Sequence, residues 1–350
     1  MLFQEQEYVN KFQIISYKGA GSFGETYQVL HTGLDQVWAL KFSKKMNCVE
    51  EIQNVLTEAQ VQVQFENDNI VKIYDVDKYE SDKNLYIYIA MEYMSKGTLG
   101  SLMKTHFISV KNAIDLFIKI LFALEYMHGQ GYLHRDIKPD NILLDENNNP
   151  KLSDFGLSNT IEECFKSGQG YTSHLAPECF SDFKNTIQTD IYAAGITLFR
   201  IINNYADWNA ILYENKITVT DLSKGNLIKK IGFNPWISEK VIRIINKATN
   251  KDPNKRYKSI TEFKNALSKL NIIYDWTPAK NGLEWNGVGT KYAYKTEITH
   301  RPRLKKWDVV VKKNNRKFKI LLCNSKQEAF DKMFEFIRGT YNEQYCANKK

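Results

Sequence analysis

The sequence lacks the features that mark secreted, zinc-binding and membrane-spanning proteins. Its five cysteines are scattered and none forms a CxxC pair, which argues against a disulfide framework and against a zinc site. No apolar run reaches the roughly 20 residues that a transmembrane helix needs. The best candidate, residues 191–202, is short and contains Gly195 and Arg200, so we expect a buried helix there.

A secretory signal peptide is not visible either. The segment MLFQEQEYVNKF at residues 1–12 lacks a basic start and an apolar stretch. Together with the unpaired thiols, this predicts a cytoplasmic protein that does not insert into membranes. The 43% apolar and 25% charged residues are typical of a globular protein, and a length of 350 residues predicts two or three compact units.

The net charge of +8 is carried by one end of the chain. Residues 271–350 contain 17 Lys and Arg against 8 Asp and Glu, a net charge of +9. Residues 1–270 contain 31 basic against 32 acidic residues, a net charge of −1. We therefore expect the C-terminal segment to form a unit of its own.

Three short motifs occur in an order and at spacings that suit one nucleotide site. They are GAGSFG at residues 19–24, HRDIKPDN at residues 134–141 and DFG at residues 154–156. Each alone is a weak signal, because short glycine patterns and three-letter strings recur by chance. Together they resemble the eukaryotic-type serine/threonine protein kinase family over about residues 12–270. Residues 271–350 show no such resemblance.

The resemblance implies a two-lobed protein kinase fold of the α+β class, with a small α+β domain added at the C-terminus. Residues 1–94 would form the β-rich N-terminal lobe and the hinge, and residues 95–270 the helical lobe. Residues 271–350 would form a small basic accessory domain. Apolar and polar positions alternate over residues 12–42 as in strands, whereas residues 112–130 repeat apolar side chains at helical spacing.

The glycine motif predicts a turn at which backbone amides approach phosphates without a Cβ in the way. VWALK at residues 37–41 is typical of a strand, and its Lys41 resembles the family's nucleotide-binding lysine. Glu58 would hold Lys41, because NDNIV at residues 67–71 resembles the segment that follows the family's glutamate helix. The nucleotide would be ATP. The resemblance assigns its binding to Gly19, Ala20, Gly21, Ser22, Phe23, Gly24, Ala39, Lys41, Glu58, Glu92, Met94 and Leu143.

The resemblance places the chemistry in the HRD loop and in the aspartate of DFG. Asp136 would accept or orient the proton of the substrate hydroxyl, and Lys138 would stabilise charge on the transferred phosphoryl group. Asn141 and Asp154 would hold Mg²⁺ ions that bridge the phosphates, since hard cations prefer oxygen ligands.

The HRDxK pattern resembles the serine/threonine branch of the family and predicts protein substrates with Ser or Thr acceptors. APE at residues 176–178 and DPNKR at residues 252–256 favour a protein over a small-molecule substrate. Within these motifs, Glu178 and Arg256 resemble a buried ion pair that braces the lobe. Asp190 would form hydrogen bonds with the backbone of the HRD loop.

Arg135 predicts regulation by phosphorylation. An arginine at this position of the family commonly pairs with a phosphate on the activation segment and orders that segment. The candidate acceptors are Ser158, Thr160, Ser167, Tyr171, Thr172 and Ser173. For any one of them, an unmodified hydroxyl in a loop is the simpler interpretation.

The C-terminal segment has its own pattern. Residues 277–289 are rich in Gly, Pro and Asn and predict a linker or an irregular entry to the domain. Residues 292–298 alternate as in a strand, and residues 307–322 predict a hairpin around KNN. The S-x-x-E pattern at residues 325–328 is typical of a capping box and predicts a helix that stops at Gly339.

The role of this basic segment stays open. Its lysines and rings allow nucleic-acid binding by phosphate contacts and base stacking. The rings considered are Trp285, Tyr292, Tyr294 and Trp307. Docking of an acidic protein partner or substrate is the favoured alternative. In the third alternative the aromatic residues only form the core, and the basic face above them is solvated.

Two alternatives exist for the chain as a whole. One is a nucleotide-binding scaffold with an inactive kinase fold, whose basic domain binds a partner or nucleic acid. The other is a kinase that phosphorylates a small molecule. Intact Lys41, Asp136 and Asp154 favour an active enzyme over the scaffold.

Overall fold

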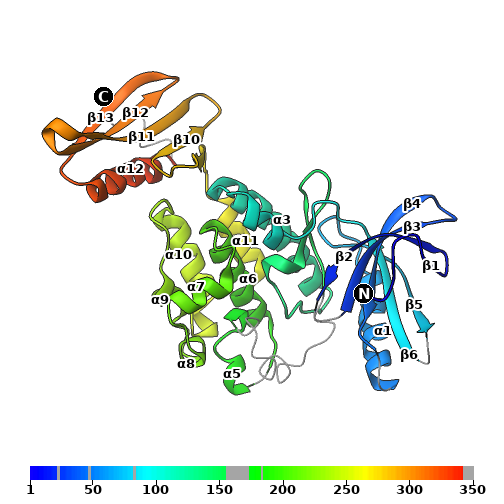
Figure 1. Ribbon diagram of the computed structural model, residues 1–350. Helices are drawn as coiled ribbons and strands as arrows, with labels where there is room; N and C mark the ends of the chain where they lie inside the picture. Colours follow the sequence, from blue (N-terminus) through cyan, green and yellow to red (C-terminus); the bar gives the residue numbers. More distant parts are fainter. Residues whose placement is uncertain (22–23, 46–48, 82–83, 155–172, 183, 342–350) are drawn as a thin grey trace.

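The computed structural model describes residues 1–21, 24–45, 49–81, 84–154, 173–182 and 184–341. They form a β-rich N-terminal lobe, a central helical lobe and a C-terminal sheet that is covered by one helix (Figure 1). This is the two-lobed arrangement with a C-terminal α+β addition that the sequence predicts. In the described part of the chain, no helix combines the length and the apolarity that crossing a bilayer requires.

The N-terminal lobe is an antiparallel six-stranded sheet in the order β1-β2-β3-β4-β6-β5. Its strands are β1 (Tyr8–Val9), β2 (Phe12–Ala20), β3 (Gly24–His31), β4 (Gln36–Ser43), β5 (Ile73–Ser81) and β6 (Asn84–Glu92). Helix α1 (Val49–Val63) packs on β5 and β6 through the buried Val55 and Ala59. Because successive side chains of a strand point to opposite faces of the sheet, one face of the N-terminal sheet can present apolar side chains to helix α1.

The helical lobe is built around two long helices, α3 (Val110–Gly129) and α6 (Ile187–Ile202). The face of α3 that carries Ile114, Phe117 and Leu121 is buried, as the helical spacing predicts. Every residue of α6 from Thr189 to Ile202 is buried. An all-round buried helix is the central element of a lobe, which explains why residues 191–202 are apolar without spanning a membrane.

Shorter elements surround these two helices and connect them. They are α2 (Leu99–Thr105), η1 (Pro139–Asn141), β7 (Ile142–Leu144), β8 (Pro150–Leu152), α5 (Cys179–Asp182), α7 (Trp208–Glu214), α8 (Val219–Ser223), α9 (Leu227–Ile231), α10 (Glu239–Ala248), η3 (Pro253–Lys255) and α11 (Ile260–Ser268). The β7–β8 hairpin lies between the catalytic loop and DFG in sequence, so its register positions both.

The C-terminal region is a five-stranded antiparallel sheet in the order β13-β12-β11-β10-β9, with helix α12 packed against it. Its elements are β9 (Asp275–Pro278), β10 (Glu284–Val288), β11 (Ala293–Arg301), η4 (Pro302–Leu304), β12 (Lys306–Lys313), β13 (Arg316–Cys323) and α12 (Lys326–Thr340). Ser325 Oγ accepts a hydrogen bond from the Glu328 amide and caps α12, as predicted. The helix continues one residue past Gly339, so the predicted stop is wrong by that margin.

The prediction of a linker or irregular entry over residues 277–289 is wrong where strands β9 and β10 occupy it, at residues 277–278 and 284–288. Gly287 has a packing role here: a Cβ on it would lie 2.5 Å from the ring of Trp276. The glycine that suggests a loop from composition is thus a site of close approach inside a sheet.

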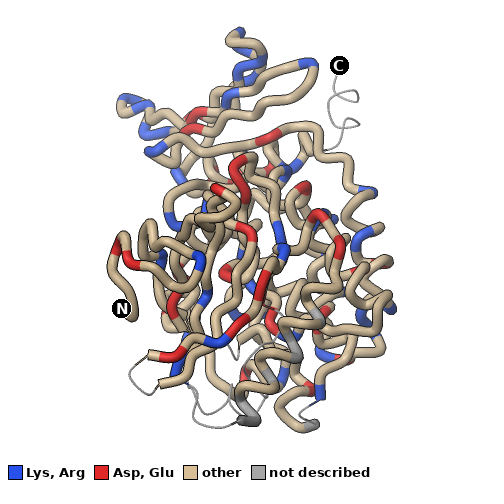
Figure 2. Tube along the Cα trace, turned by 90° about the vertical axis from the view of Figure 1, so that its right-hand side faces the viewer, with Lys and Arg blue, Asp and Glu red and all other residues tan. Residues whose placement is uncertain are grey.

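The C-terminal sheet shares a hydrophobic core with the helical lobe. The ring of Trp285 lies 5.6 Å from that of Phe107 and 5.2 Å from that of Trp236, measured between centroids. Arg338 of α12 also donates a hydrogen bond to the carbonyl of Pro235. Lys and Arg are concentrated along the strands of this sheet (Figure 2). The basic segment is therefore packed on the helical lobe, with its charge toward solvent.

Candidate active site

Lys41 and Asp154 meet between the two lobes. Lys41 lies on β4, Asp154 follows β8, and the Lys41 ammonium forms an ion pair with the Asp154 carboxylate. Burial opposes ionisation of Asp154, but the charge and hydrogen bond of Lys41 and the charge of Lys138 hold its pKa below the usual value. The carboxylate is thus ionised at neutral pH.

The catalytic loop gathers three of the predicted residues. Lys138 Nζ lies 2.6 Å from Asp136 Oδ2, and Asn141 Nδ2 lies 2.8 Å from the same oxygen and 2.8 Å from the Asp136 carbonyl. Lys138 is buried, whereas the Asp136 side chain is 38% exposed. The carboxylate is fixed by two donors on one side and can be approached from the other.

Asp190, in the first turn of α6, binds the backbone of this loop. Its carboxylate accepts hydrogen bonds from the backbone amides of His134 at 2.8 Å and Arg135 at 2.9 Å, as predicted. It also lies 2.9 Å from His128 Nε2 at the end of α3, a partner that the sequence did not indicate. Arg135 and Asp154 both adopt left-handed backbone conformations, with φ of 71° and 59°. Such strain is sustained only where surrounding contacts fix the backbone.

The residues predicted to bind Mg²⁺ have suitable atoms. Both side-chain hydrogen bonds of Asn141 run from Nδ2 to Asp136, which leaves Oδ1 as its acceptor toward a cation. Asp154 supplies an ionised carboxylate. Mg²⁺ is commonly held by one or two side chains together with substrate phosphates, so this donor set fits the metal.

The structure describes four of the six residues of the glycine motif at residues 19–24. A Cβ on Gly24 would lie 2.0 Å from the Phe42 carbonyl, so glycine is required there. The Gly21 amide donates to the Gly24 carbonyl at 2.7 Å and closes the turn. Ser22 and Phe23 lie outside the described residues. Gly19 and Ala20 end strand β2 beside this turn, where Gly19 pairs with Thr26 and Ala20 with Glu25.

The apolar residues predicted to line the base pocket belong to one cluster. Ala39 and Met94 are buried in it, and Leu143 packs against it. The Glu92 carboxylate lies 2.7 Å from Lys151 Nζ, which ties the hinge strand to β8. Nothing in the sequence pointed to this pair, because its members are 59 residues apart. The side chain of Glu58 lies outside the described part of α1.

Of the predicted acceptors of the activation segment, the structure describes Ser173. Ser158, Thr160, Ser167, Tyr171 and Thr172 lie outside the described residues. Ser173 is buried at 1% exposure, and its Oγ accepts a hydrogen bond of 2.7 Å from Trp208 Nε1. An enzyme could reach that hydroxyl only after this contact opened, so modification of Ser173 stays a prediction that requires local opening.

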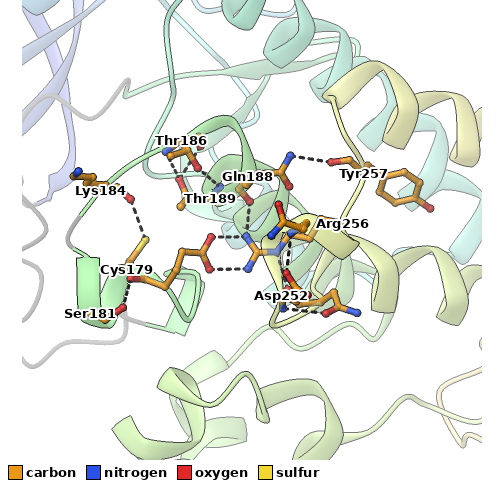
Figure 3. Close-up of polar contacts among 12 residues, drawn as sticks. Cys179, Ser181, Lys184, Thr186, Gln188, Thr189, Asp252, Arg256 and Tyr257 are labelled. Carbon is orange, nitrogen blue, oxygen red and sulfur yellow. Dashed lines mark hydrogen bonds and ion pairs between the residues drawn. The ribbon is translucent and has the colours of Figure 1, made fainter.

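The predicted pair of Glu178 and Arg256 is present in the helical lobe. The guanidinium binds both carboxylate oxygens, at 2.6 and 2.7 Å, and also donates to the carbonyls of Gln188 and Asn250 (Figure 3). The Arg256 side chain is fully buried. Every terminal nitrogen thus has a partner, which makes this a structural brace.

Two buried histidines should make the fold sensitive to mild acid. Burial lowers the pKa of His134 and, with the charges of Arg200 and Lys138, lowers that of His174 well below 6.5. In the unfolded chain both titrate near 6.5, so below that pH the unfolded state binds protons that the folded state does not. The free energy of unfolding should therefore fall as pH drops below about 6.5, by up to about 1.4 kcal/mol per pH unit for each histidine.

Melting temperatures measured at pH 7.5, 6.5 and 5.5 would check this. His174→Gln should flatten the dependence between pH 6.5 and 5.5. His106→Gln, at an exposed position, is the matched control and should leave it unchanged. An equal slope in wild type and His174→Gln would contradict the role of the buried imidazole.

Comparisons with known proteins agree with this geometry. The family model of the protein kinase domain matches residues 12–268. Serine/threonine-protein kinase 32C of Mus musculus is 25% identical over 286 residues, which cover 78% of this chain and 57% of the relative. Serine/threonine-protein kinase PrkC of Bacillus subtilis is 31% identical, covering 71% of this chain and 39% of the relative. Probable serine/threonine-protein kinase PknB of Lactococcus lactis is 28% identical, covering 73% and 41%. The chain thus spans between 39% and 57% of the length of these three relatives.

Proposed function

This chain belongs to the protein kinase family, and from that premise we propose that it transfers the γ-phosphoryl group of ATP to serine or threonine hydroxyls of proteins. The observation that carries the proposal is the constellation around Asp136. Its carboxylate is held by Lys138 and Asn141, and the Lys41–Asp154 pair lies at the start of DFG. Phosphoryl transfer depends mainly on positioning and on charge stabilisation, which such a set supplies.

We assign the roles as follows. Asp136 accepts or orients the proton of the acceptor hydroxyl, with its free side toward the substrate. Lys138 stabilises charge that develops on the transferred group. Lys41 binds the phosphates of ATP. When bound, Mg²⁺ neutralises phosphate charge, and the Asn141 and Asp154 oxygens hold it in place.

The ion pair between Lys41 and Asp154 has a consequence for nucleotide binding. Lys41 and Asp154 neutralise one another through their ion pair. An incoming phosphate and its metal offer each of the two a new partner of opposite charge. The site can therefore keep both groups charged in a partly buried position, whether or not a nucleotide is bound.

Protein rather than small-molecule substrates are supported by the brace between Glu178 and Arg256. It fixes the glutamate of the APE motif, which lies close after Ser173 and His174 in the sequence. The relatives carry serine/threonine-protein kinase in their names, which supports the same acceptor class here.

The scaffold alternative is not favoured. An inactive kinase fold usually lacks one of Lys41, Asp136 or Asp154, and all three are present and paired here.

We propose residues 271–350 as an accessory domain that docks acidic protein surfaces. Nucleic-acid stacking finds less support, because Trp285 and Tyr294 are each 3% exposed and belong to the core. Tyr292 is 39% exposed, and the Lys313 ammonium lies over its ring at 3.5 Å. A basic face above a packed aromatic core suits attraction of acidic partners.

Incubation of the purified chain with labelled ATP and Mg²⁺, with basic and acidic proteins as substrates, tests the proposal. We expect label on serine and threonine, and loss of labelling when EDTA removes the metal. Phosphosite mapping of the kinase itself would also show whether Thr160, Ser167, Tyr171 or Thr172 is modified and available to Arg135. No label with Mg²⁺ or Mn²⁺, even after treatment by another kinase, would restore the scaffold alternative.

A further inference from the structure

Arg200 is a buried cation that no carboxylate neutralises among the residues that the structure describes. It lies on α6 and is 5% exposed. Its Nη1 lies 3.4 Å from His174 Nε2, and the guanidinium carbon lies 5.0 Å from the ring centroid of Trp208. Its Nε is fully buried and has no hydrogen-bond partner. A buried charge with an unpaired donor is costly, and an anionic group that reached Nε would offset that cost.

Arg256 shows how the same lobe satisfies an arginine with a structural role. That guanidinium has a bidentate carboxylate and two backbone carbonyls. Arg200 has one long contact to an imidazole and one aromatic face. Asp140 is the acidic residue that acts on Arg200 through space, and it forms no ion pair with it. Arg256 therefore has a carboxylate and two carbonyls as acceptors, and neither kind of contact is present at Arg200 among the described residues.

Helix α6, which carries Arg200, contacts the catalytic loop, because Thr197 Oγ1 donates a hydrogen bond of 2.9 Å to the Ile137 carbonyl. His174 follows Ser173 and is separated from the APE motif by Leu175, and Trp208 Nε1 donates a hydrogen bond to Ser173 Oγ. Lys138, which contacts Asp136, is close enough to His174 to lower its pKa. Since burial lowers the pKa of Arg200 only to about 10, the guanidinium stays charged at neutral pH beside a neutral imidazole. The positive charge of Arg200 thus lies beside His174 on a helix that contacts the catalytic loop.

We propose that Arg200, held between His174 and Trp208, binds an acidic side chain of the protein substrate near the acceptor hydroxyl, so that the enzyme selects acidic sequences. This inference rests on the proposed kinase function. A carboxylate or phosphate group can accept from Nε and a terminal nitrogen together, the geometry that guanidinium favours. The basic C-terminal domain, with a net charge of +9, would attract the same acidic substrates over a longer range.

Serine peptides with Glu, Gln or Lys placed in turn at each position around the acceptor test the idea. The wild type should prefer Glu over Lys by at least about tenfold in kcat/KM at one or more positions. Phosphoserine at those positions shows whether the site favours a carboxylate or a phosphate. A preference for Lys, or no preference at any position, in an active enzyme would overturn the proposal.

Variants of Arg200 assign the preference to this residue. Arg200→Met should abolish it and melt at an equal or higher temperature, since an apolar side chain replaces an unpaired buried charge. Arg200→Glu should reverse it toward Lys peptides, and that gain cannot result from misfolding. Arg243→Met, at an exposed arginine of α10, is the matched control and should keep the wild-type preference.

The proposed kinase activity and the proposed binding of acidic side chains by Arg200 can fail separately. If no peptide is phosphorylated, the proposed function fails. The binding of acidic side chains by Arg200 is then tested by fluorescence anisotropy with labelled Glu and Lys peptides. Tighter binding of the Glu peptide by wild type than by Arg200→Met would uphold the binding of acidic side chains by Arg200 without catalysis. If wild type and Arg200→Met each bound the Glu and Lys peptides equally, the proposal that Arg200 binds acidic side chains would be wrong.

Discussion

Replacing Asp136 with asparagine should lower kcat for phosphoryl transfer by about 10²- to 10⁴-fold. The amide has nearly the shape of the carboxylate but cannot accept the proton of the substrate hydroxyl. Contacts to Lys138 and Asn141 run through one oxygen, Oδ2, so an amide oxygen can replace part of this network. The KM for ATP should change little, because Asp136 is not assigned to the phosphates. Steady-state kinetics with ATP and a serine peptide would measure both.

Asp115→Asn is the matched control for this substitution. Asp115 is a surface carboxylate on α3 that pairs with Lys111, and it should be replaceable without loss of activity. If Asp136→Asn kept more than a tenth of wild-type kcat, the carboxylate could not be the proton acceptor in the reaction that we propose. A large rise in the KM for ATP would instead indicate that the substitution disturbs the nucleotide site.

Removing Glu178 should be among the most destabilising changes in the helical lobe. Glu178→Ala leaves the fully buried Arg256 guanidinium without its carboxylate, which typically costs about 3–5 kcal/mol. For a domain of this size the loss corresponds to a fall in melting temperature of roughly 10 °C. Arg256→Met should cost less, because the Glu178 side chain is 20% exposed and can be hydrated. Differential scanning fluorimetry of the single variants would rank them.

The double variant Glu178→Leu with Arg256→Met separates the pair from its surroundings. With both charges replaced by apolar groups, stability should return most of the way toward wild type. A double variant that is as unstable as the sum of its single variants would show that the two side chains act independently. In that case the backbone contacts of Arg256 to Gln188 and Asn250 would be the main source of stability.

Much of the active site follows from local sequence, because its residues lie on short contiguous segments. Asp136, Lys138 and Asn141 belong to one loop of eight residues, whose internal hydrogen bonds bring them together. Gly24 is required by a backbone contact at the end of its own strand. Such features depend on chain neighbours, so a motif can predict them.

The sequence was least informative where partners are far apart or where composition misleads. The contact of His128 with Asp190 joins the ends of two helices, and Lys151 reaches Glu92 from another strand. Residues 277–289 resemble a linker by composition, but strand pairing and the ring of Trp276 make them part of a sheet. Ser173 resembles other loop hydroxyls until Trp208 is seen to bury it. No local pattern encodes these contacts.

The sequence by itself determined the family, the lobes and the residues of the catalytic loop, since each depends on a local pattern of side chains and spacing. The tertiary structure alone decided which charges are neutralised. It pairs Lys41 with Asp154 and Arg256 with Glu178, and it buries Arg200 without an ion-pair partner among the described residues. It also packs the basic C-terminal sheet onto the helical lobe through Trp285. The physical reason is that desolvation and ion pairing depend on what long-range packing brings together, which spacing along the chain does not specify.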